Sequence, residues 1–244
     1  MKKQKGYTLI EYMVAIVIGL ILLSGFSYVF LGMKQSFNTQ SGLSEVQENG
    51  RFAMYFLTNE LQNAGYVAVN NPSQVVDNVI PHLISGAGNT SDSGDIKVSD
   101  EVEISYKDEN GVDCLGDAPA ADGIINNRFF VEDGQLKCEG INGNPQPLIG
   151  GVEALHFIYG VDTDSDTDGV PNKFVKASEL ALDEYSRISA IKVFLLLAST
   201  DNVSKSDIDQ EFTIARENGT FDASDRKIRK LFATTVSLPN QPDF

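Results

Sequence analysis

The sequence predicts an α+β protein: one long N-terminal helix, hydrophobic at first and then amphipathic, packed on a mostly antiparallel sheet. Three observations lead to this prediction. Residues 12–33 carry no formal charge, no proline occurs before Pro72, and the later chain alternates short apolar stretches with loop-forming residues. We therefore expect a helix over residues 7–64 and an exported globular domain over residues 65–244.

The uncharged segment covers 22 residues, from Tyr12 to Met33. As a helix rising about 1.5 Å per residue, it is long enough for the roughly 30 Å hydrocarbon core of a bilayer. A cleaved signal peptide would have a shorter apolar core and a small-residue cleavage site, and residues 20–30 offer none. A plain membrane anchor explains the length, and the lysines ahead of the segment agree with a cytoplasmic N-terminus. An anchor explains neither Gly6 nor Glu11, because a carboxylate at membrane depth costs about 3 kcal/mol.

Residues 5–11, KGYTLIE, resemble the class III leader of type IV pilins and pseudopilins. In that family a peptidase cleaves after the glycine, the new N-terminal residue is N-methylated, and a glutamate is the fifth residue of the mature chain. The resemblance implies a leader peptide of residues 1–6, cleavage between Gly6 and Tyr7, and methylation of Tyr7. Glu11 is then the signature acid. Most members carry phenylalanine where this chain has Tyr7, a departure that keeps the aromatic ring.

Glu11 is interpreted as a device that sets the register between subunits. Cleavage frees an α-amino group at Tyr7, which with a reference pKa of about 7.7–8.0 is largely cationic at neutral pH. An unpaired charge inside a bundle of apolar helices is strongly unfavourable. The carboxylate of one subunit can meet the amine of another only at particular axial offsets, so we expect this pair to fix docking. The alternative is a glutamate that reaches the membrane interface without a partner.

From Lys34 the same helix is predicted to continue with an amphipathic pattern up to Ala64. Its apolar stripe consists of Leu43, Val46, Ala53, Leu57, Leu61 and Ala64, widened by Phe52 and Phe56. Gly65 is well placed to end the helix, which at 58 residues would be about 87 Å long. Five glycines either permit bending and close approach or are simply tolerated: Gly19, Gly25, Gly32, Gly42 and Gly50.

The predicted globular domain is strongly acidic. Residues 1–64 hold five basic and four acidic side chains, which leaves 14 basic and 30 acidic ones in residues 65–244, a net charge of −16. This balance argues against direct nucleic-acid binding, because phosphate contacts need neutralising lysine and arginine. The compact basic cluster of Lys227, Arg229 and Lys230 flanks a predicted strand and is interpreted as a solvated edge.

About 180 residues suffice for one domain with its own core. Alternating apolar residues predict strands over 102–106, 155–159, 191–197 and 231–235. A hairpin over 128–138 is predicted to turn at Asp133-Gly134. Residues 85–95 and 140–147 are predicted to be loops, and residues 177–185 a short helix.

The two cysteines, Cys114 and Cys138, lie on either side of the predicted hairpin. The membrane segment places the C-terminal part outside the cytoplasm, where an oxidising compartment favours a disulfide. Closing a loop of about 25 residues would stabilise the fold by about 3 kcal/mol in chain-entropy terms. Reduced structural thiols and a metal-binding pair are the alternatives.

Residues 162–169, DTDSDTDG, resemble the first half of a calcium-binding loop. With Asp164 as the first ligand, position nine is Asn172, but position twelve is Val175 rather than a glutamate, so an EF-hand is not indicated. Two interpretations stay open. One is a looser calcium site with Asp164, Asp166 and Asp168 as ligands, and the other is a solvated acidic turn. No other cofactor is expected.

An enzymatic function is not expected. The histidines are His82 and His156, and His156 alternates within an apolar strand, where a packed or surface-facing side chain is more usual than a general base. The sequence has no glycine-rich phosphate loop, nucleophile elbow or metal-binding histidine pair.

Several later stretches resemble the PilW-type minor pilins of the type IV pilus. They are residues 45–53 (EVQENGRFA), 61–66 (LQNAGY), 127–131 (NRFFV), 150–153 (GGVE), 159–164 (YGVDTD) and 232–236 (FATTV). The resemblance implies a pilin-like fold and a low-abundance subunit in a complex that primes filament assembly or forms the tip. Such a subunit supports twitching motility, adhesion or DNA uptake.

The partners implied are other minor pilins, the major pilin, the prepilin peptidase, the inner-membrane assembly machinery and the inner membrane. The expected location is a single pass through the inner membrane with a periplasmic C-terminal domain, and afterwards the pilus or cell surface. One alternative is a pseudopilin of a type II secretion system. Another is a membrane-anchored adhesin or calcium-binding module with no filament role.

Overall fold

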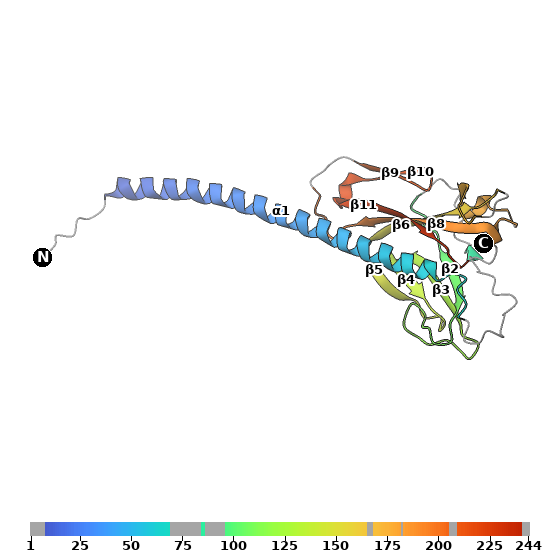
Figure 1. Ribbon diagram of the computed structural model, residues 1–244. Coiled ribbons are helices and arrows are strands. Elements are labelled where there is room, and N and C mark those ends of the chain that lie inside the picture. The colour runs from blue at the N-terminus through green and yellow to red at the C-terminus, as the bar shows by residue number, and fades with distance from the viewer. Residues whose placement is uncertain are drawn as a thin grey trace.

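A computed structural model describes residues 8–68, 84–85, 96–164, 168–181, 183–204 and 209–240. These residues fold into one long helix and two antiparallel sheets with an added hairpin, which confirms the predicted α+β class (Figure 1). The elements are α1 (Leu9–Gln62), β1 (Ile84–Ser85), β2 (Val102–Lys107), β3 (Ile124–Glu132), β4 (Gln135–Glu139), β5 (Gln146–Gly150), β6 (Val152–Val161), β7 (Lys173–Val175), β8 (Ile188–Ala198), β9 (Gln210–Ile214), β10 (Glu217–Phe221) and β11 (Arg229–Ser237), with 3-10 turns η1 (Ala177–Glu179), η2 (Tyr185–Arg187) and η3 (Ala223–Asp225).

Helix α1 is 54 residues long, and its N-terminal half projects away from the rest of the protein (Figure 1). It starts at the N-cap Thr8 and ends at the C-cap Asn63, and Gly65 adopts a φ of 75°, as expected for a residue that stops a helix. The end of the helix is also capped from a distance, because Asn240 Nδ2 donates to the carbonyl of Gln62 at 2.8 Å.

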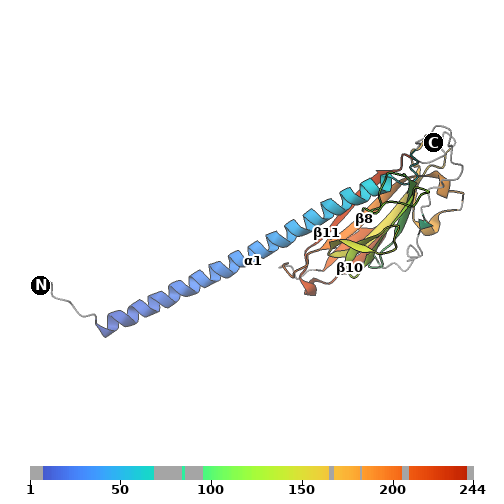
Figure 2. The same cartoon turned by 90° about the horizontal axis from the view of Figure 1, so that it is seen from below.

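The C-terminal half of α1 packs along β11 and β8 (Figure 2). Its buried residues are Gly42, Val46, Gly50, Ala53, Leu57 and Leu61, which follow the predicted stripe. A Cβ at Gly50 would lie 2.2–2.6 Å from ring atoms of Phe232, so glycine is needed there for close approach. At Gly19, Gly25 and Gly32 a Cβ would meet no described atom within 4 Å.

The four-stranded sheet has the order β11-β8-β6-β7, and the five-stranded sheet has the order β1-β2-β3-β4-β5. Helix α1 covers one face of the four-stranded sheet, where its buried side chains join a core with alternate residues of β6 and β8 such as Leu155 and Val193. The chain passes from one sheet to the other at Gly151, which has a φ of 77°. A side chain there would meet the carbonyl oxygen of Ala198 at 2.5 Å.

The hairpin of β9 and β10 covers the opposite face of the four-stranded sheet. The second core, on that face, contains Ile96, Ala154, Ile158, Leu196, Ile214, Ala215 and Phe221. The domain therefore has three layers in this region: helix, sheet and hairpin.

The predicted strands and the 128–138 hairpin are confirmed, whereas three finer predictions were wrong. Residues 177–185 do not form one helix: the 3-10 turn η1 lies at the start of this range, and the 3-10 turn η2 begins at its last residue. Strand β5 begins at Gln146, inside the predicted loop 140–147. The predicted loop 85–95 was wrong at Ser85, which belongs to β1, and its other residues lie outside the described residues.

Arg229 is not on a solvated edge, because its side chain is 3% exposed. It donates to Glu153 and Asp225. Its guanidinium lies 4.9 Å from the ring centroid of Phe221 in β10. The interpretation was wrong because the hairpin that covers this residue was not predicted.

Candidate functional site

The projecting half of α1 is the largest apolar surface in the described structure. Its large apolar side chains from Leu9 to Phe37 are all exposed; Tyr28, for example, is 82% exposed and Phe26 69%. One 18-residue window has a mean hydropathy of 2.5 and no buried residue, so by length and composition this helix could cross a membrane. A surface of this size is not stable in water, so lipid or other helices must cover it.

Glu11 lies in the first turn of this helix, and Thr8 fixes where the helix begins. The hydroxyl oxygen of Thr8 accepts a hydrogen bond from the backbone N–H of Glu11 at 3.3 Å. A carboxylate in the first turn also interacts favourably with the helix dipole. Thr8 was not predicted to have a role, although the Thr-x-x-Glu spacing is the signature of a capping box. Gly6 and Tyr7 lie outside the described residues.

The domain first touches α1 close to the end of the uncharged segment. The side chains of Gln35 and Thr39 donate to the carbonyl oxygen of Val203, at 3.3 and 2.9 Å. A Cβ at Gly42 would lie 2.7 Å from Val203 Cγ2. These contacts were not predicted, because residues 199–204 have no distinctive sequence pattern.

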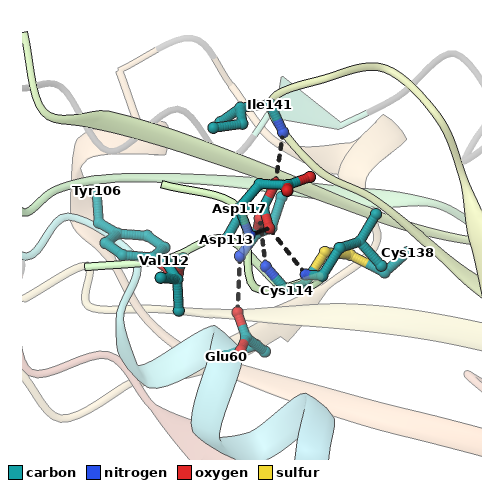
Figure 3. The surroundings of a disulfide bond; sticks show 10 residues. Glu60, Tyr106, Val112, Asp113, Cys114, Asp117, Cys138 and Ile141 are labelled. Atoms are coloured by element: carbon teal, nitrogen blue, oxygen red, sulfur yellow. Dashed lines mark hydrogen bonds between the residues drawn. A yellow bond between two sulfur atoms is a disulfide. The ribbon is translucent and has the colours of Figure 1, made fainter. Parts of the chain in front are cut away.

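Cys114 and Cys138 form the predicted disulfide, with their Cα atoms 6.5 Å apart (Figure 3). Next to it, Asp113 is buried and organises the surrounding loops. Its carboxylate accepts backbone N–H bonds from Leu115, Asp117 and Ile141, each at 2.9 Å. The bridge therefore ties a loop with no strand pairing of its own to β4.

The aspartate-rich loop is held by bonds within the protein. The side-chain oxygen of Asn172 accepts the backbone N–H groups of Thr163 and Asp164, at 2.6 and 3.1 Å. Asp162 is fully buried, and Arg187 lies 3.7 Å from it. In the described part of this loop, the guanidinium of Arg187 is thus a cation beside the Asp162 carboxylate.

The described residues contain no group of three or more His, Cys, Asp or Glu side chains that could hold a metal ion. Asp164 Oδ2 accepts a hydrogen bond from Asn172 at 2.6 Å, and Asp168 Oδ1 accepts one from Val170 at 2.8 Å. Asp166 lies outside the described residues.

His156 is a packed residue. It is 4% exposed, and its ring nitrogens face the carbonyl of Ile96 at 2.9 Å and the carboxylate of Asp100 at 3.3 Å. Burial opposes protonation of the ring, but the bonds to Asp100 and to the Ile96 carbonyl outweigh it and raise the pKa of His156. The pair fastens residues 96–100 to β6, which is a structural role.

Two family models match this chain. The model described as Type IV Pilus-assembly protein W matches residues 128–240, and the prokaryotic N-terminal methylation motif matches residues 1–27. Together these matches support a type IV minor pilin of the PilW type. The first match runs from β3 to just beyond β11, and the second covers the N-terminal residues and the start of α1. This minor pilin therefore has a pilus-related role.

The fold of the minor pilin agrees with this assignment. It is similar to a type IV-like pilin from Thermus thermophilus, with a TM-score of 0.51 and 16% identity, over 80% of this chain and 97% of that one. A match to the GspK-GspI-GspJ complex of the enterotoxigenic Escherichia coli type 2 secretion system covers 76% of this chain and 95% of the other. Its TM-score of 0.37 and identity of 12% do not establish a common fold. No curated protein matches the sequence.

Proposed function

We propose that this minor pilin is a non-catalytic subunit of the complex that primes type IV pilus assembly, with a final position at or near the tip. The observation that carries the proposal is the projecting half of α1. It exposes apolar side chains from Leu9 to Phe37 and carries a single acid, Glu11, in its first turn. Such a surface suits a helix that moves from a bilayer into a bundle of similar helices.

The proposed sequence of events begins in the inner membrane, with the acidic domain in the periplasm. The prepilin peptidase removes residues 1–6, and Tyr7 is methylated. The new amine of one subunit then pairs with Glu11 of another, since neither charge is stable alone among apolar helices. Other minor pilins, the major pilin and the inner-membrane machinery are the partners, and the assembled pilus supports twitching motility, adhesion or DNA uptake.

Mass spectrometry of the native chain tests the maturation step. We expect an N-terminus at Tyr7 with one extra methyl group. The variant Gly6→Ala should keep its leader, and pili should not form. A membrane-anchored adhesin or calcium-binding module would be indifferent to this substitution, so an intact, unmethylated N-terminus in the wild type would overturn the proposal.

Substitution of Glu11 tests the docking step. Glu11→Ala should still be cleaved but should be recruited to pili at least 100-fold less, because removing one partner of a buried ion pair costs about 3–5 kcal/mol. Glu48→Ala is the matched control, since Glu48 is exposed on the docked half of the same helix. Normal amounts of the Glu11 variant in sheared pili would contradict the docking role.

Deletion of the chain separates the pilus from the secretion alternative. We expect loss of pili with normal protein secretion. Loss of type II secretion with normal pili would instead assign the chain to the pseudopilins.

A further inference from the structure

Three parts of the chain meet beneath the last turns of α1. Glu60 is on the helix, Asn127 is in β3, and Cys114 is in the loop that the disulfide ties to β4. Figure 3 shows Glu60 pointing from the helix toward the loop that carries Asp113 and Cys114. Asn127 lies between the helix and the loop and is completely buried.

Asn127 connects the loop to the helix through both ends of its amide. Its Oδ1 accepts the backbone N–H of Cys114 at 3.1 Å, and its Nδ2 donates to Glu60 Oε2 at 2.8 Å. A backbone N–H can only donate and a carboxylate oxygen accepts, so these partners determine the orientation of the amide. The Asn127 amide is thus hydrogen-bonded on one side to a disulfide-bonded cysteine and on the other side to the last turn of α1.

The helix end needs this support. An acidic side chain in the last turn interacts unfavourably with the helix dipole, and α1 has no basic residue there. Burial raises the pKa of Glu60, the hydrogen bond from Asn127 lowers it, and the charge of Asp113 raises it further. The Asn127 amide is therefore the group that stabilises the Glu60 carboxylate.

Two other anchors hold the loop when the bridge is absent. Asp113 accepts the N–H of Ile141, and the Tyr106 hydroxyl donates to the carbonyl of Val112, both at 2.9 Å. Reduction should therefore free Cys114 locally while the loop and the domain stay folded. The Cys114 N–H bond to Asn127 is the link between the bridge and α1.

We infer that the Cys114–Cys138 bridge is a redox-sensitive lock on the joint between α1 and the domain, acting through Asn127 and Glu60. Closing the bridge moves two electrons and two protons from the two thiols to the disulfide of an exchange partner, which leaves as a dithiol. In the oxidised chain the last turns of α1 are held against the domain. In the reduced chain these turns open more often, although the fold persists.

Hydrogen exchange of the full chain in detergent micelles, oxidised and after treatment with a phosphine reductant, tests this lock. We expect reduction to speed amide exchange in residues 57–64 by at least about tenfold, the effect of losing the hydrogen bond from Asn127 to the charged Glu60 carboxylate. Exchange in residues 191–197 of β8 should not change. Equal acceleration in both segments would mean that the bridge stabilises the whole domain, and it would overturn the inference.

Variants of the connection provide the second readout. Asn127→Ala should speed exchange in residues 57–64 in the oxidised chain, and reduction should then add nothing. Glu60→Gln keeps an acceptor for Asn127 and should respond to reduction like the wild type, whereas Glu60→Ala should not respond. Asn126→Ala, an exposed neighbour in β3, is the control. An undiminished response to reduction in both Asn127→Ala and Glu60→Ala would refute the role of this connection.

Discussion

Gly50→Ala tests whether the closeness of α1 to the sheet, rather than helix propensity, sets the residue at this position. Gly50 is buried on the docked face of the helix, opposite Phe232 of β11. An added Cβ would lie 2.2, 2.3 and 2.6 Å from three ring atoms of Phe232, so the ring or the helix must shift.

Two opposing effects give the expected magnitude. Alanine is favoured over glycine inside a helix by about 1 kcal/mol. Overpacking a core typically costs about 1–3 kcal/mol. Because the clash is with a ring that lies against the sheet, we expect the cost to win by about 1 kcal/mol. For a domain of this size, that change lowers the unfolding midpoint by about 2–4 °C.

Thermal unfolding of the full chain in detergent, followed by near-ultraviolet circular dichroism, measures this shift. Gly32→Ala is the control, because a Cβ there meets no described atom within 4 Å and the domain midpoint should not change. In Gly50→Ala/Phe232→Leu the smaller side chain should recover part of the loss, so the double variant should be more stable than the sum of the single changes. A midpoint that rises in Gly50→Ala would refute the reasoning.

Three further predictions concern charges in the domain. The folded-state pKa of Glu60 is raised above its unfolded value of 4.5, so the stability that this group contributes is present below that value and is lost as the pH rises through the folded pKa. In denaturant titrations at pH 8, Glu60→Gln should therefore unfold less readily than the wild type. An equal loss of stability with rising pH in both proteins would contradict this. Arg229→Met leaves Glu153 and Asp225 without their shared cation and should destabilise the domain by about 3–5 kcal/mol. The control Arg216→Met breaks an exposed pair with Glu179 and should cost less than about 1 kcal/mol. Similar losses in the two variants would show that burial of Arg229 is unimportant. Millimolar calcium should not shift the unfolding midpoint, because Arg187 already lies beside Asp162, and a midpoint that rises with calcium concentration would instead indicate a bound ion.

Two hairpins show how far local sequence patterns predict this fold. The 128–138 hairpin was predictable because Asp133 and Gly134 both adopt positive φ, 53° and 69°, and Asp-Gly is a favoured pair for that conformation. The hairpin of β9 and β10 turns at Ala215 and Arg216, with φ of 48° and 73°. These residue types rarely adopt positive φ, so no local signal marks the turn.

The candidate site divides in the same way. The place of Glu11 in the first turn of α1 was predictable because the leader motif is local, and Thr8 could have been recognised from its spacing to Glu11. The connection between Glu60 and Asn127 joins residues 67 positions apart, and only tertiary packing brings them together. Gly50 interrupts the apolar stripe of the sequence, but the ring that fills its place comes from Phe232, near the other end of the chain.

The hydrogen bonds from Gln35 and Thr39 to Val203 have a geometric consequence for a subunit embedded as far as Met33. No free linker separates the apolar segment from the domain, so the domain follows each tilt and rotation of α1. Which flank of the domain meets a neighbouring subunit then depends on how the helix itself is oriented, and not on independent swinging of the domain.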